Sequence, residues 1–138
     1  MSDEGKTVDG SEPLDALHAQ VERLFTPLLA LAKGDDMIEL DELTRTLHVR
    51  VEGWFAEVEA QVDATLAGDP AVIDAVKGDH DGAREIFGEM RTLVEDARDD
   101  RPVDREHLLA SMQAVQMALQ DQMQREREKV WPRLRGGK

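Results

Sequence analysis

Apolar residues recur at three- and four-residue steps along almost the whole of this 138-residue chain, in four runs separated by short polar breaks. The runs span residues 14–31, 40–62, 73–97 and 108–130. This spacing places the apolar side chains of each run on one face of an α-helix. The alternation of apolar and polar residues that is typical of strands does not occur. The pattern predicts an all-α chain, and the short connections favour an up-down-up-down four-helix bundle.

Capping residues and helix breakers predict where these helices begin and end. Ser11 is suited to an N-cap with Pro13 in the first turn, and Asp69-Pro70 repeats this pattern at the third helix. The expected helix ends, in chain order, lie at Gly34, near Gly68, at 99–102 and at Pro132. We therefore expect three segments, which are a flexible acidic tail over 1–12, the bundle over 13–132 and a basic tail over 133–138.

The composition excludes several classes of partner and site. Lysine and arginine number 17 against 30 aspartate and glutamate residues, which gives a net charge of −13. Such an acidic surface repels phosphate groups and anionic membranes, so neither nucleic acid nor a membrane is expected as a partner. The absence of cysteine excludes disulfides and thiolate metal ligands. No apolar run approaches the about 20 residues of a membrane span, and the start lacks a secretory pattern. A cytoplasmic location is expected.

Polar side chains interrupt or flank the apolar faces of all four expected helices. They are His18, His48, Glu52, His80, Gln122 and Glu126. For one histidine alone, a hydrogen-bonded core position is the commoner explanation, and one buried amide can set helix register. Burying one unpartnered polar group costs about 2–7 kcal/mol, against a net stability of about 5–15 kcal/mol for a domain. For the whole set, a divalent cation that satisfies these groups together is the better interpretation.

The heights of these residues along a bundle agree only in part. The midpoint of His18 and His48 falls at the first expected turn, and the midpoint of His80 and Gln122 falls at the third. The midpoint of His48 and His80 falls four or five residues before the second turn. At about 1.5 Å per residue, this mismatch is a stagger on the order of 10 Å.

The order of these residues resembles the hemerythrin-like (HHE cation-binding) family. That family has a histidine on helix 1, His-x3-Glu on helix 2, a histidine on helix 3 and a second His-x3-Glu on helix 4. The matching residues are His18, His48, Glu52, His80 and Glu126. Asp79-His80 resembles the family's acidic-His element, and 126–132 resembles its closing Glu-x4-aromatic-Pro. The chain departs at Gln122, where the family has histidine, and at Arg84, where part of the family has a further histidine.

The resemblance implies an oxo- and carboxylate-bridged di-iron centre held by the matching residues. Gln122 is then either a weak ligand, which makes the two halves of the centre unequal, or an outer group that hydrogen-bonds Glu126. Glu22, one turn after His18, is an additional candidate carboxylate. Imidazole and carboxylate without thiolate suit iron, in a di-iron or mononuclear site, and also zinc or manganese.

The expected function is a non-haem iron protein that binds or senses a small ligand such as dioxygen or nitric oxide, and a sensor would need a protein partner. A binding or sensing protein is expected rather than an enzyme. Two alternatives stay open. One is a peroxide-decomposing or ferroxidase-like di-iron enzyme, and the other is a metal-poor helical interaction module.

Overall fold

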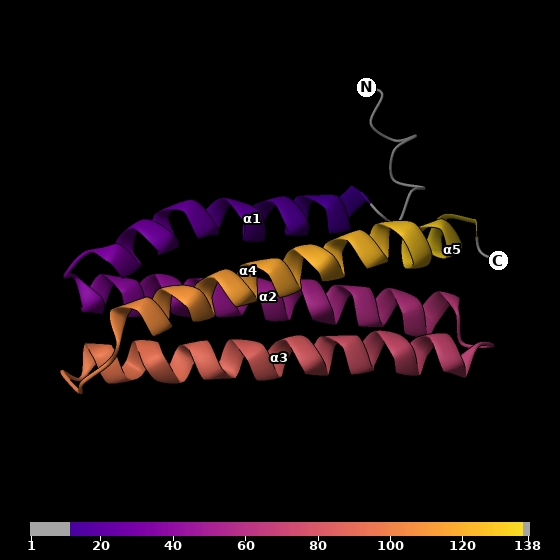
Figure 1. Ribbon diagram of the computed structural model, residues 1–138. Coiled ribbons are helices and arrows are strands. Elements are labelled where there is room, and N and C mark those ends of the chain that lie inside the picture. Colours follow the sequence, from indigo (N-terminus) through magenta and orange to yellow (C-terminus); the bar gives the residue numbers. More distant parts are fainter. Residues whose placement is uncertain (1–11, 137–138) are drawn as a thin grey trace, which may run out of the picture.

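Four long helices pack against one another in the computed structural model, which describes residues 12–136 (Figure 1). The helical segments, in chain order, are α1 (Glu12–Lys33), α2 (Met37–Thr65), α3 (Pro70–Arg98), α4 (Arg105–Arg125), the π-helical segment η2 (Glu126–Val130) and α5 (Trp131–Gly136). Consecutive long helices run in opposite directions, and α1 and α3 each contact both α2 and α4. The predictions of an all-helical chain and of four packed helices are confirmed for the described residues.

The helix boundaries follow the local signals at most positions. Three aspartates cap helices, since the side chains of Asp36, Asp69 and Asp104 accept hydrogen bonds from backbone N–H groups of the first turns of α2, α3 and α4. Helix α1 ends one residue before Gly34, as predicted. The expected Ser11 cap and most of the acidic tail lie outside the described residues.

The prediction that the last helix ends at Pro132 is wrong. Helical structure continues through η2 and α5 to Gly136, so part of the expected basic tail is helical. The backbone N–H of Trp131 bonds to the carbonyl of Glu126, five residues back, which is π-helical pairing. This change of pairing begins a new helical turn at Trp131. The N–H that Pro132 lacks therefore falls in a first turn, where proline is tolerated.

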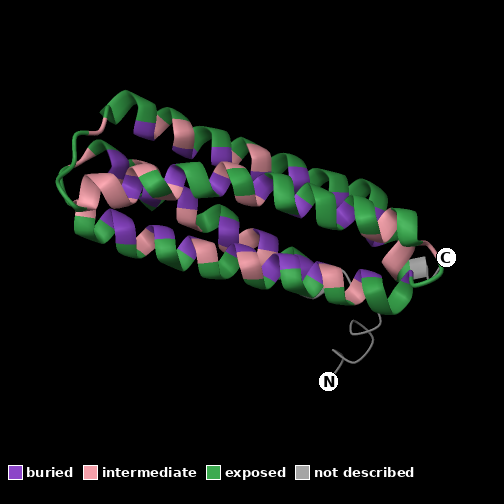
Figure 2. Ribbon diagram, turned by 90° about the horizontal axis from the view of Figure 1, so that it is seen from below, coloured by how far each residue is buried: buried purple, intermediate pink, exposed green. Residues whose placement is uncertain are grey.

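The core runs along the axis of the bundle, where each long helix turns its buried face inward (Figure 2). Its largest fully buried side chains include Trp54 and Phe55 of α2, together with leucines and methionines from all four long helices. Six polar side chains of the described residues are also buried, and these are His18, Asp41, Thr44, His80, Gln122 and Glu126. No helix within residues 12–136 is long and apolar enough to cross a membrane.

One capping residue also links the start of α3 to α5. Asp69 caps α3 and accepts a hydrogen bond from Arg133 at 2.9 Å, and this bond, with that of Val72 N–H, lowers the pKa of the Asp69 carboxyl. Asp69→Ala should lower the free energy of unfolding, because the N-cap of α3 is lost, and urea denaturation measures the change. The control Asp74→Ala, at an exposed position inside α3, should change it by less than about 0.5 kcal/mol. Equal effects of the two substitutions would contradict the capping role.

Candidate functional site

The carboxylate of Glu126 lies at the centre of the polar core and is fully buried. Its Oε1 atom accepts hydrogen bonds from Trp54 Nε1 at 2.8 Å and from His18 Nε2 at 3.0 Å. Its Oε2 atom accepts from His80 Nε2 and from Gln122 Nε2, each at 3.0 Å. We call Glu126 and these four donors the polar core. Each carboxylate oxygen therefore has two N–H donors, and the donors come from all four long helices.

The four donors keep Glu126 ionised despite its burial. Burial raises the pKa of the Glu126 carboxyl, because a buried charge loses its hydration. The hydrogen bonds from the two histidines, the glutamine and the indole outweigh this effect and lower the pKa from 4.5 to about 2. The polar core thus contains a permanent negative charge at neutral pH.

The π-helical segment begins at Glu126 and sets the direction of the side chains after it, whereas the backbone N–H of Glu126 still bonds to Gln122 O as in an α-helix. Glu126 is the first residue of η2, and Val130, the last residue of η2, is also buried. A π turn contains one more residue than an α turn, so it rotates the following side chains relative to an unbroken helix. Such turns are often found at functional sites. The sequence did not reveal this segment, because the residues on the inner face of 108–130 still follow one another at steps of three and four.

Both ring nitrogens of His80 face carboxylate oxygens. Nε2 lies 3.0 Å from Glu126, and Nδ1 lies 2.7 Å from Glu59 Oε2. Both contacts are hydrogen bonds only when the ring carries both protons. The ring stacks on Phe55, with 3.9 Å between centroids and 5° between planes. The sequence did not single out Glu59 or Phe55 as site residues, because both fit the ordinary amphipathic pattern of α2.

His18 is held between two indole rings at the opposite side of the carboxylate. It stacks on Trp131 at 4.8 Å and meets Trp54 edge-on at 4.7 Å between ring centroids. Within residues 12–136, two buried nitrogens have no hydrogen-bond partner, and they are His18 Nδ1 and Trp131 Nε1. The Nε2 atom of His18 must carry the proton that is donated to Glu126.

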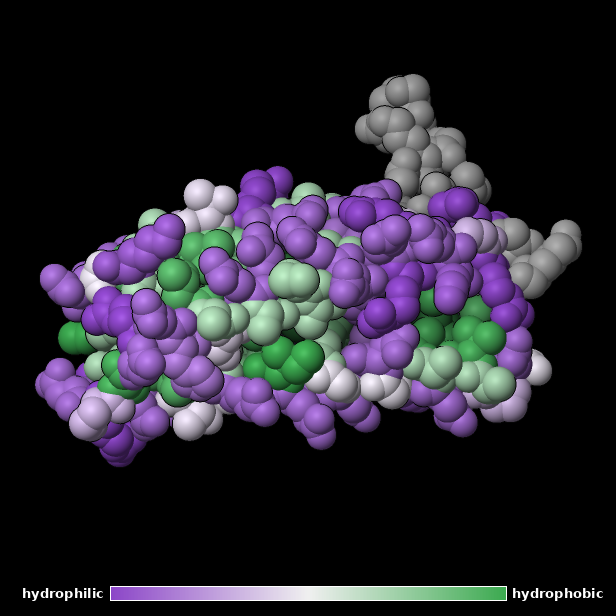
Figure 3. All heavy atoms as spheres, viewed as in Figure 1, coloured by the Kyte–Doolittle hydropathy of each residue, from purple (hydrophilic) through white to green (hydrophobic). Residues whose placement is uncertain are grey.

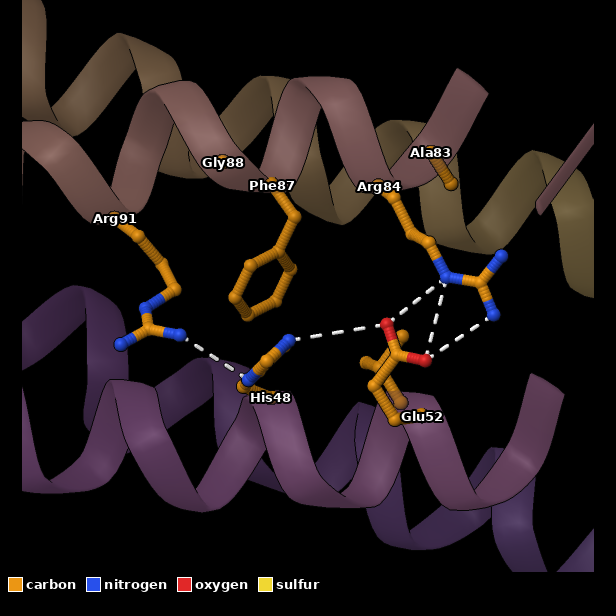
Figure 4. Close-up of a pocket in the computed structure, with 8 residues that line it drawn as sticks. His48, Glu52, Ala83, Arg84, Phe87, Gly88 and Arg91 are labelled. Atoms are coloured by element: carbon orange, nitrogen blue, oxygen red, sulfur yellow. Dashed lines mark hydrogen bonds and ion pairs between the residues drawn. The ribbon is translucent and has the colours of Figure 1, made fainter. Parts of the chain in front are cut away.

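His48 and Glu52 lie in a separate groove between α2 and α3, shown in Figure 4. The side chain of His48 is 39% exposed, so the expectation that it points into the core is not met. Its Nδ1 accepts from Arg91 at 3.2 Å, and Arg84 Nε donates to Glu52 Oε2 at 3.0 Å. Arginine side chains therefore take the places around His48 and Glu52 that a metal ion was expected to take.

The stagger between α2 and α3 explains this separation. His80 stacks on Phe55, whereas His48 contacts Phe87 with 5.4 Å between ring centroids. His48 precedes Phe55 by seven residues on α2, which is about 10 Å along a helix. The mismatch in height along the bundle that the sequence indicated is therefore present in the structure. Trp54 belongs to the polar core and Phe55 lies beside it, where His48 was expected.

A chain of charged contacts joins the groove to the polar core. Arg84 Nη2 lies 3.7 Å from Glu59 Oε2, the same oxygen that His80 contacts. Arg84 also pairs with Glu52 in the groove and donates to Asp81 at 2.8 Å. These bonds raise the pKa of Arg84, with the Glu52 bond contributing most. His80, Glu59 and Arg84 therefore connect the buried carboxylate to the surface.

The described residues do not fit a two-ion centre. Within residues 12–136, no three or more His, Asp or Glu side chains are grouped so that they would hold a metal ion. His18 and His80 contact different oxygens of Glu126, so each side of the carboxylate offers only one imidazole. The candidate Glu22 is exposed. Gln122 donates to Glu126, which is the outer role that was one of its two expected roles.

Comparison with known proteins gave no match to a family model, to a curated protein or to a solved structure.

Proposed function

We propose that this chain is a metal-independent helical binding module, which corresponds to the metal-poor alternative among the sequence-based expectations. The observation that carries the proposal is that both oxygens of Glu126 already accept two N–H donors each. The sequence argument for a metal was that six polar groups need a common partner. Four of them, together with Trp54, form hydrogen bonds with one another that leave only His18 Nδ1 without a partner among their atoms in the described residues. The other two, His48 and Glu52, accept hydrogen bonds from Arg91 and Arg84.

The electrostatics also support this proposal. Two of the donors, Trp54 Nε1 and Gln122 Nε2, direct N–H groups at the carboxylate, and an indole N–H is only a donor. Donors stabilise an anion and leave no lone pair for a cation. The stability of the bundle should therefore come from the polar core itself and not from a bound ion.

Metal removal tests the proposal directly. Protein purified without a histidine tag should contain well under one equivalent of iron, zinc or manganese by elemental analysis. Dialysis against EDTA should change the melting temperature by less than about 1 °C, because an ion that does not bind the native state does not stabilise it. One tightly bound equivalent, with a lower melting temperature after its removal, would contradict the proposal.

A second candidate function is a mononuclear iron site in a hemerythrin-like bundle that binds a small ligand such as dioxygen or nitric oxide. It is favoured by the bond between His80 Nδ1 and Glu59, since metal-ligating histidines commonly direct their other ring nitrogen at a carboxylate. The residues that would hold the ion are His18, His80 and Glu126, whose side chains would have to turn from their present contacts, because they are not grouped around an ion position in residues 12–136. Anaerobic addition of Fe²⁺ distinguishes the two functions. This candidate predicts one bound equivalent that His80→Ala abolishes, whereas the metal-independent module predicts no saturable binding.

A further inference from the structure

A hollow of about 260 Å³ lies between the start of α3 and the segment where α4 continues into η2. Its apolar lining is provided by Val72, Ala75 and Val76 of α3 and by Val130 of η2. Figure 3 shows hydrophobic surface at this end of the molecule, with hydrophilic surface around it. Pockets for drug-sized ligands occupy about 300–1,000 Å³, so this hollow suits a smaller molecule.

Two cationic side chains border the hollow. Lys129 is exposed and forms no ion pair with another residue in the described part of the chain. Arg125 donates to Gln122 Oε1 at 2.8 Å and lies 3.6 Å from Asp79, the one exposed carboxylate of the lining. The other lining carboxylate, Glu126, already has its four donors. Lys129 is therefore the charge at this site that is available to a ligand.

The distribution of charge along the chain also indicates that the ligand is an anion. Residues 125–138 contain six lysine or arginine residues and only two glutamates, although the whole chain has a net charge of −13. This segment therefore repels an anion less than the rest of the chain does. An apolar lining beside a cation is complementary to a molecule with an apolar chain and one negative charge.

We propose that this hollow, which we call the α3–η2 pocket, binds a small monocarboxylate with an apolar chain. The chain of the ligand packs against Val72, Val76 and Val130, and its carboxylate pairs with Lys129. Arg125 adds a second positive charge at the rim. Arg125 also bonds to Gln122, and Gln122 bonds to Glu126, so Arg125 at the rim of the pocket is two hydrogen bonds from the buried carboxylate. This inference rests on the proposed function in that it names the ligand class of the binding module.

Octanoate is the probe for this site. Isothermal titration calorimetry at pH 7 and constant ionic strength should show saturable binding of sodium octanoate at a single site. Octanol, which has the chain without the charge, should bind at least about tenfold more weakly, because a charge-assisted contact is lost. Acetate and octylammonium should show no saturable binding, since the first lacks the chain and the second has the wrong charge.

Two substitutions at exposed positions locate the site without disturbing the core. Lys129→Gln should weaken octanoate binding about tenfold, while Lys77→Gln, which removes an exposed lysine elsewhere on the bundle, should leave it unchanged. Ala75→Phe places a ring in the pocket and should abolish binding. The matched control Ala114→Phe, at an exposed position on α4 that does not line this pocket, should not.

Several outcomes would overturn the inference. They are an absence of saturable octanoate binding up to about 10 mM, equal affinities for octanoate and octanol, or equal effects of Lys129→Gln and Lys77→Gln. Elemental analysis of the same samples separates this result from the proposed function. A stoichiometric metal ion would contradict the metal-independent module whatever octanoate does, and metal-free protein that fails to bind octanoate would contradict only the ligand assignment.

Discussion

Replacing Glu126 with glutamine is expected to lower the free energy of unfolding at pH 7 by about 3–5 kcal/mol, the range for breaking a buried ion pair. The substitution keeps the size of the side chain, so no cavity adds to the effect. It removes the charge that four donors surround and puts an N–H group where an acceptor oxygen stood. Urea denaturation followed by circular dichroism measures the change.

The matched control is Glu128→Gln, two residues further along η2. Glu128 is exposed and accepts one hydrogen bond from Gln124. Its replacement should change the free energy of unfolding by no more than about 0.5 kcal/mol. If Glu126→Gln changed the free energy of unfolding as little as this control does, the four hydrogen bonds would not stabilise the native state. The polar core would then not explain how a charged carboxylate is buried in this bundle.

The stability of the wild-type protein should also fall steeply in acid, because of the same carboxylate. The pKa of Glu126 is lowered from 4.5 to about 2 in the folded state. A lowered folded-state pKa gives stability that is fully present above the unfolded value, near pH 4.5, and is lost as the pH falls toward 2. The shift corresponds to a loss on the order of 3 kcal/mol over this window.

Comparison with Glu126→Gln isolates this loss from the titration of the other carboxylates. The difference in free energy of unfolding between wild type and variant should be constant from pH 7 to about 5 and should shrink as the pH approaches 2. Denaturation curves at half-unit steps of pH measure it. A difference that stays constant down to pH 2 would show that the pKa of Glu126 is the same in the folded and unfolded states, and the assignment of a lowered pKa would be wrong.

The positions of the helices were predictable because their signals are local. Asp69-Pro70 places a capping carboxylate and a preformed φ angle at the start of α3, and both act within one turn. Gly34 and the polar residues 99–102 likewise interrupt helices without reference to any other part of the chain. Pro132 did not end the helix, because the π-helical pairing before it places Pro132 in the first turn of α5, where its missing N–H is not required.

The candidate site was predictable only in part. His18, His80, Gln122 and Glu126 were identified because a polar residue on an apolar helix face is visible in the sequence, and the structure brings all four together. His48 was grouped with them because it flanks the apolar face of its helix, and the structure places it in the α2–α3 groove. The mismatch of height along the bundle was the signal that this residue did not belong with the others.

The places where the helices form, the face of each that is buried and the polar residues on those faces could be predicted from the sequence, since all three depend on spacing within a few residues of one helix. Which polar groups meet is set by the packing of the helices. That depends on how far each helix slides along its neighbour, and a slide of one turn, about 5 Å, exchanges one partner for another. Because α2 is displaced along α3, Phe55 lies beside His80, and His48 accepts a hydrogen bond from Arg91 instead. Glu126, at the end of α4, accepts hydrogen bonds from donors on four helices at the place where the sequence predicted a metal site.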